Sequence, residues 1–113
     1  MKRIIVFLLL GLFLVPLAWG GSSPVLAQDS GGKGIFADKC AMCHGTDGKG
    51  NGPAASAFNP APKDFNTPAF WQNITRAKIK DTIENGHGSM PAVDLNSSQI
   101  KAVIDYMEHS FKK

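Results

Sequence analysis

Cysteine is scarce in this sequence, and its scarcity excludes several kinds of site. Only two of the 113 residues are cysteines, Cys40 and Cys43. A structural zinc site usually takes four protein ligands, which two thiols cannot supply, and no histidine stands at a recognisable zinc spacing from them. A thioredoxin-like redox pair would need a βαβ pattern around the C-x-x-C spacing, and the sequence has none. The two thiols therefore need another explanation.

Regular β patterning and a strong charge excess are also missing. No segment alternates apolar and polar residues, and no internal repeat or low-complexity tract is present. We therefore expect an all-α protein. The chain has 12 basic and 9 acidic side chains, a balance too even to indicate binding to nucleic acid or to a membrane surface.

The only long apolar run lies at the N-terminus and has the form of an export signal. Lys2 and Arg3 precede an uncharged apolar stretch over residues 4–17, and small residues follow up to Ala27. This order predicts a cleaved signal peptide over residues 1–27, with the cut between Ala27 and Gln28. Removal of this segment would lower the formal net charge from +3 to +1.

An uncleaved membrane anchor is the alternative interpretation of this segment. The apolar stretch reaches Gly20 at most and is broken by Pro16, so it is shorter than the roughly 20 residues of a transmembrane helix. No cysteine lies near residue 27 to carry a lipid. We expect residues 28–113 to form one mature domain in the periplasm, with no stable membrane association once the signal is cleaved.

The two cysteines belong to the pentad Cys40-Ala41-Met42-Cys43-His44, which has the form C-x-x-C-H. Two thiols at this spacing can add across the two vinyl groups of one haem. The histidine that follows is then carried beneath the ring, where its imidazole can bind the iron. A single pentad predicts one covalently attached haem c.

Three helices are expected around this pentad. Asp29 or Ser30 would cap a first helix that runs into Cys40, and its glycines would need a close helix crossing to be tolerated. A second helix is predicted over residues 75–85. The last is the clearest, because residues 96–99 have the form of a capping box. Its apolar residues follow at helical spacing: Ile100, Val103, Ile104, Met107 and Phe111.

Residues 45–68 are expected to form a loop rich in glycine and proline. A loop of this length in a compact domain is usually functional or disordered. Because it follows the pentad directly, we expect it to wrap the edge of the haem. The apolar side chains available to face the macrocycle are Phe58, Phe65, Phe70 and Trp71.

The iron needs a second axial ligand opposite His44, and three candidates are weak. Met42 lies between the two attached cysteines and is tied to the His44 side. Met107 belongs to the apolar stripe of the last helix, where a core methionine is the ordinary explanation. His109 falls off that stripe and is expected to be a surface histidine.

Met90 is the preferred ligand and His87 its rival, because both lie in one flexible segment between two expected helices. Glycines in this segment would let the backbone approach the haem, and Pro91 restricts Met90 to an extended conformation. A thioether favours ferrous iron and raises the potential relative to two histidines.

A second set of residues, outside the pentad, also forms a recognisable pattern along the chain. Its members are Gly32, Phe36, the proline-rich residues 59–65, residues 83–86, Met90, Pro91, Val103 and Tyr106. With the pentad, this pattern resembles the class I cytochromes c. It is most similar to the small bacterial monohaem type and to the cytochrome domains of oxidase subunits. The resemblance extends over nearly all of residues 31–113.

The resemblance implies the class I fold, with three main helices and long loops around one covalent haem, and with the first and last helices crossing. It implies that the carbonyl of Pro60 or Pro62 accepts a hydrogen bond from the His44 ring, which would fix the ring and tune the iron. It also implies that Trp71 reaches a haem propionate. A core tryptophan is the alternative.

The function expected from these residues is one-electron transfer between Fe(II) and Fe(III), without catalysis. The alternatives are a haem enzyme of the peroxidase type and a gas or redox sensor with a displaceable Met90. An enzyme would need acid–base groups near an open iron position, and only His87 is evident. A sensor would need room for an output domain. We expect a monomer whose partners are other redox proteins.

Overall fold

The computed structural model describes residues 20–21 and 27–113. The expected signal peptide over residues 1–27 lies almost wholly outside this range. The helices are α1 (Ala27–Lys39), α2 (Ala41–His44), the 3-10 helix η1 (Ala55–Ala57), α3 (Pro68–Gln72), α4 (Arg76–Asn85) and α5 (Ser97–Phe111). Within the described residues there is no strand, only an isolated bridge between His87 and Met90. The all-α prediction is confirmed.

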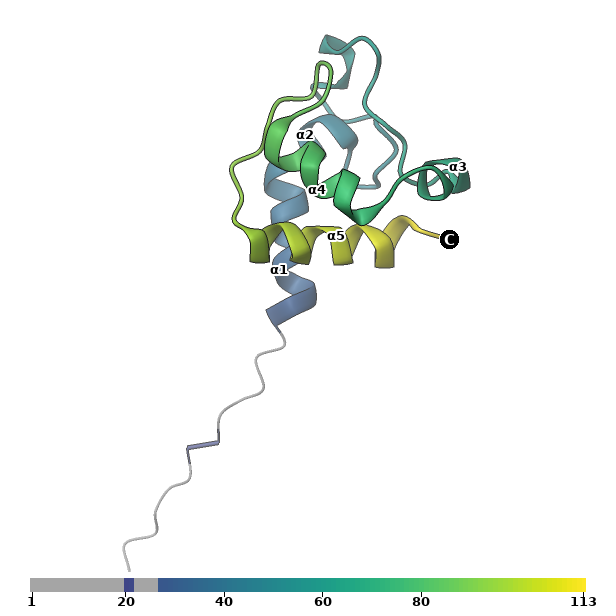
Figure 1. The fold of residues 1–113 in the computed structure, drawn as a ribbon. Coiled ribbons are helices and arrows are strands. Elements are labelled where there is room, and N and C mark those ends of the chain that lie inside the picture. Colours follow the sequence, from purple (N-terminus) through teal and green to yellow (C-terminus); the bar gives the residue numbers. More distant parts are fainter. Residues whose placement is uncertain (1–19, 22–26) are drawn as a thin grey trace, which may run out of the picture.

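Helices α1 and α5 cross and form the base of the domain (Figure 1). The crossing occurs at Gly32, where a Cβ atom would overlap the carbonyl oxygen of Ala102 and come within 2.9 Å of the Tyr106 Cβ. Glycine is therefore required here by the approach of the two backbones. The close crossing expected for one of the α1 glycines is confirmed.

The predicted starts of the later helices are confirmed. The Thr75 side chain accepts from the Lys78 amide at the start of α4. At the start of α5, the Asn96 side chain accepts from the Gln99 amide while the Gln99 side chain accepts from the Asn96 amide. The predicted cap of α1 is wrong, because α1 begins at Ala27, before Asp29 and Ser30.

The predicted loop over residues 45–68 is largely confirmed, since η1 is its only regular segment before Pro68. Helix α3 was not predicted. It begins at Pro68, where the fixed φ of proline suits the first turn of a helix. A helix of five residues has too few apolar positions to show a period in the sequence.

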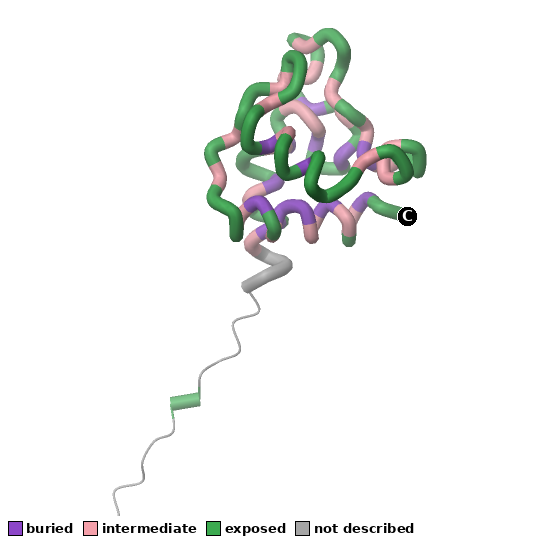
Figure 2. The backbone as a smooth tube through the Cα atoms, viewed as in Figure 1, coloured by how far each residue is buried: buried purple, intermediate pink, exposed green. Residues whose placement is uncertain are grey.

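The hydrophobic core lies between the α1–α5 crossing, α4 and the loop (Figure 2). Its buried members are Phe36, Ala41, Phe65, Ile79, Ile83, Ile100, Val103, Ile104, Met107 and Phe111. Met107 is a core methionine and His109 is exposed, as predicted. Phe65 contacts Phe36, Phe70 and Phe111, so the loop is anchored to the crossing by aromatic side chains.

Among the helices of the described residues, none combines the length and the apolar character needed to cross a membrane. The apolar stretch over residues 4–17 lies outside that part of the chain.

Candidate functional site

The pentad forms one short helical turn immediately after α1. Cys40 precedes the first residue of α2, and the His44 amide donates to the Cys40 carbonyl at 2.9 Å. This turn holds both thiols and the imidazole on one short, fixed segment. Ala41 is buried, whereas Met42 is 60% exposed. Met42 therefore points to solvent, and no disulfide joins Cys40 to Cys43.

Two adjoining cavities, of about 240 and 360 Å³, lie beside this turn. They share part of their lining: Cys43, His44, Lys63, Thr82, His87, Met90 and Pro91. The smaller cavity is otherwise lined mainly by residues 58–62, and the larger by residues of α1, α3, α4 and α5 and of the loops between them. Together they form a mostly apolar cleft of the size that binds organic cofactors.

Met90 reaches this cleft from a tight turn after α4. The His87 amide donates to the Met90 carbonyl and the Met90 amide to the His87 carbonyl, each at 3.0 Å. Gly86 and Gly88 have φ of 77° and 57°, which favour glycine. The turn brings both Met90 and His87 to both cavities, so the structure keeps both candidates for the second axial ligand in place.

Burial shifts the pKa values of two residues of the pentad. It raises the pKa of the Cys40 thiol to about 11, with a smaller contribution from Cys43. It also lowers the pKa of His44, against the opposing effect of a hydrogen bond to Lys63. A neutral imidazole keeps the nitrogen lone pair that a metal requires.

The His44 ring is oriented by the loop. Its Nδ1 lies 3.2 Å from the carbonyl oxygen of Lys63, and its ring stacks on Phe65 with centroids 4.5 Å apart. With Nδ1 directed at a carbonyl, Nε2 is the nitrogen left for a metal. The expected acceptor was Pro60 or Pro62. In this structure the carbonyl that faces the ring is that of Lys63, the residue directly after Pro62.

Pro60 and Pro62 nevertheless line the smaller cavity, whereas Trp71 lines neither. The Trp71 Nε1–H donates to the Phe65 carbonyl at 2.7 Å, and the side chain packs against the core. This bond uses the only side-chain donor of Trp71, and the contact of Trp71 with a propionate stays a prediction. The alternative of a core tryptophan matches the structure.

Sequence reasoning missed several polar residues of the cleft. Lys78 and Asn73 line the larger cavity, and Thr82 lines both. A helical period would have placed Lys78 and Thr82 on one face of α4 with Ile79 and Ile83. It could not have shown that this face meets the pentad.

The donor set fits haem c and no other metal site. In the part of the chain that the structure describes, no group of three or more His, Cys, Asp or Glu side chains could hold a metal ion. The cleft instead offers two thiols, the imidazoles of His44 and His87, and the thioethers of Met90 and Met107 among apolar walls. This combination suits covalent attachment of a large apolar ring with two axial ligands.

Comparison with known proteins agrees with this chemistry. The family model described as "Cytochrome c" matches residues 30–111. Cytochrome c6 of Euglena gracilis is 33% identical over 79 residues, which are 68% of this chain and 86% of that protein.

Two further similarities are narrower. The "Cbb3-type cytochrome c oxidase subunit FixP" of Rhizobium meliloti (strain 1021) is 51% identical over 39 residues, 34% of this chain and only 13% of FixP. The solved structure of the "KustC0563 c-type cytochrome" superposes with a TM-score of 0.60 at 22% identity, covering 73% of this chain and 98% of that one. This second likeness confirms the fold.

Proposed function

Because this chain belongs to the cytochrome c family, we propose that it is an exported carrier of single electrons that catalyses no reaction of its own. It holds one covalently bound haem c at Cys40 and Cys43 and is a haem-based electron carrier. The bound group would supply an iron that alternates between Fe(II) and Fe(III).

The observation that carries this proposal is the placing of His44 and Met90 on the same two cavities. Burial lowers the pKa of His44, which favours the neutral ring, and Nδ1 faces the Lys63 carbonyl, so the other ring nitrogen can bind the iron. The Met90 thioether would bind on the other side. With both residues bound, no iron position is left for a substrate, and axial ligation is what separates electron transfer from peroxide or oxygen chemistry.

Pro60, Pro62 and the other apolar residues of the cleft would exclude water from the ring. Exclusion of water and a neutral thioether ligand both favour the reduced iron, which carries one positive charge less. We therefore propose a potential higher than that of a carrier with two histidine ligands.

The signal-like segment supports export, and haem attachment on the outer side of a bacterial membrane needs a translocated chain. We propose a periplasmic monomer with residues 1–27 removed. Its partners would be other redox proteins, met briefly through a small interface, as is usual for electron-transfer complexes.

Stopped-flow mixing tests the carrier proposal. The haem-loaded protein should exchange electrons rapidly and reversibly with a small redox protein. Carbon monoxide, azide and hydrogen peroxide should leave its spectrum unchanged on the same timescale. Fast turnover of peroxide would contradict the proposal and favour a haem enzyme, whereas fast and reversible binding of carbon monoxide would favour a sensor.

A further inference from the structure

The cleft carries positive charge without a matching carboxylate. Lys39, Lys63 and Lys78 line the larger cavity, and no Asp or Glu belongs to the lining of either cavity. Haem c brings two propionate carboxylates, which lie at the edge of the ring opposite its two vinyl groups. Carboxylates that enter a mostly apolar cleft need cationic or hydrogen-bonding partners.

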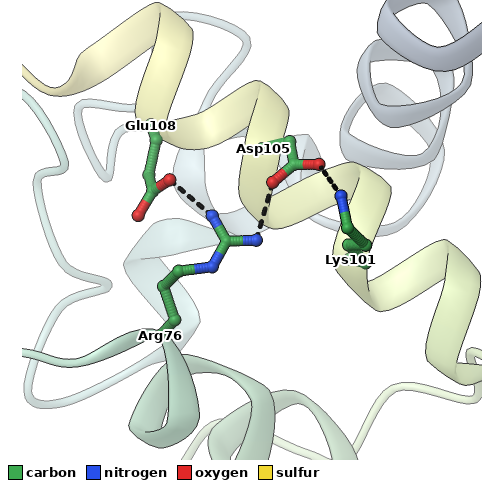
Figure 3. A network of polar contacts seen from close by, with 4 residues as sticks. All are labelled: Arg76, Lys101, Asp105 and Glu108. Atoms are coloured by element: carbon green, nitrogen blue, oxygen red, sulfur yellow. Dashed lines mark hydrogen bonds and ion pairs between the residues drawn. The ribbon is translucent and has the colours of Figure 1, made fainter.

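The first turn of α4 is unusual because it contains two cations and no acidic residue, Arg76 and Lys78. Cations are disfavoured at the positive end of a helix dipole. Arg76 is compensated by Asp105 and Glu108 of α5, as Figure 3 shows. Its guanidinium is therefore already paired with the two carboxylates of α5.

Lys78 has no comparable partner. Its Nζ lies 3.3 Å from Asp81, and both side chains are more than half exposed, at 52% and 54%. Exposed pairs of this kind contribute little. Because Lys78 also lines the larger cavity, it is the cation of this turn that can serve a group bound in the cleft.

Two neutral polar side chains line the cleft near Lys78. Thr82 lies one turn beyond Lys78 on α4 and lines both cavities, and Asn73 lines the larger cavity just before α4. Residues four apart share one face of a helix. Lys78 and Thr82 therefore line the cleft from one face of α4.

The other two lysines are poorly placed for a propionate. Lys39 adjoins Cys40, whose thioether fixes the vinyl edge of the ring. Lys63 gives its carbonyl to the His44 ring and so belongs to the axial side. Trp71, which the class I resemblance would assign to a propionate, donates to Phe65 instead.

We propose that Lys78, with Thr82 and Asn73 beside it, binds a propionate of haem c and thereby raises the reduction potential of the iron. The proposal rests on the proposed function and adds a positioning residue to it. A positive charge beside the carboxylate favours the reduced form. Loss of that charge therefore lowers the potential.

The test compares four variants of the haem-loaded protein: Lys78→Gln, Lys78→Arg, Lys80→Gln and Lys39→Gln. Lys80 is the matched control, because it lies on the same helix, pairs with Glu84 at 3.7 Å and lines neither cavity. K78Q should lower the equilibrium constant for reduction about threefold, or about 28 mV at 59 mV per tenfold. K80Q should shift the reduction potential by less than half as much as K78Q does. K78R should have the reduction potential of the native protein.

A vibrational readout separates a direct contact from a general charge effect. Infrared difference spectra between oxidised and reduced protein, with ¹³C in the haem carboxylates, should show a shifted carboxylate band in K78Q and not in K80Q. Equal potentials and bands in K78Q and K80Q would overturn the proposal. So would a band that moves in Lys39→Gln and stays in place in K78Q. Absence of any reversible one-electron couple in the native protein would instead contradict the proposed function.

Discussion

His87 and Met90 are three residues apart in one tight turn, and each side chain could bind an iron in the cleft. Two backbone hydrogen bonds between His87 and Met90 close the turn. Their exposure differs, since Met90 is half-buried and His87 is exposed. A thioether loses little hydration on entering an apolar cleft, which favours Met90 there.

Replacing Met90 with alanine should therefore open the sixth position of the iron. We expect the ferrous variant to bind carbon monoxide readily and its potential to fall, both measured by optical titration. His87→Ala is the matched variant from the same turn and should leave the spectrum nearly unchanged. If His87→Ala opened the sixth position and Met90→Ala left the spectrum unchanged, His87 would be the ligand.

Two glycines of α1 differ in whether the structure has room for an added Cβ atom. At Gly32 an added Cβ meets the Ala102 backbone, whereas at Gly34 it has nothing within 4 Å. The two residues share one helix and differ only in the side that they turn to α5.

Gly32→Ala should lower the free energy of unfolding by about 1–3 kcal/mol, because the crossing must open. Gly34→Ala should raise it by about 0.5–1 kcal/mol through better helix propensity. Denaturant titration of the two haem-loaded variants measures both changes. A stabilising Gly32→Ala would show that the helices do not cross this closely.

At the scale of elements, α4 and α5 are joined on the surface by one charge network. The Arg76 guanidinium bonds to Asp105 at 2.6 Å and to Glu108 at 2.5 Å, and Lys101 bonds to Asp105 at 2.7 Å (Figure 3). These bonds lower the pKa of the Asp105 carboxyl, with Lys101 the larger cause and Arg76 next. The network holds the first turn of α4 over the second half of α5.

Arg76→Gln should cost about 0.5–1 kcal/mol of stability, because the side chains are partly exposed and screened. The folded pKa of Asp105 is depressed, so its contribution is fully present above the unfolded value of about 3.9 and is lost as pH falls through the folded value. The difference in the free energy of unfolding between the native protein and the variant should therefore be largest at neutral pH and become smaller in acid. Thermal unfolding at several pH values measures it. A difference that stays constant into strong acid would rule out this network as its source.

At the scale of the whole molecule, the cleft interrupts the apolar core. The larger cavity is lined by Ile79, Ile83 and Met107, which also belong to that core. A small domain has little apolar surface to bury by itself. Haem c would fill this cleft with a rigid apolar body, so we expect the cofactor to stabilise the fold as well as to carry the electron.

The denatured mature protein should accordingly have the mass of residues 28–113 plus one haem, and its haem should resist extraction by acidic solvent. Mass spectrometry of protein from a host that attaches haem c tests both statements. A mass without haem and two titratable thiols would refute covalent attachment. A mass that includes residues 1–27 would instead favour the uncleaved anchor.

The sequence alone determined the features that depend on neighbouring residues. The pentad depends on the spacing of Cys40, Cys43 and His44, and the start of α5 depends on Asn96 and Gln99 in a single turn. The all-α class followed from the absence of strand alternation, and the crossing of the first and last helices followed from the class I resemblance.

Only the tertiary structure decided which distant groups meet. It assigned the carbonyl opposite the His44 ring to Lys63 in place of Pro60 or Pro62, and it paired the Trp71 donor with Phe65. It also brought Lys78 and Thr82 to the cleft. A carbonyl points in a direction set by the local backbone dihedrals, and a residue in a proline-rich loop has no period that reveals them. Such contacts arise when the loop folds over the core, and they leave no pattern in the sequence.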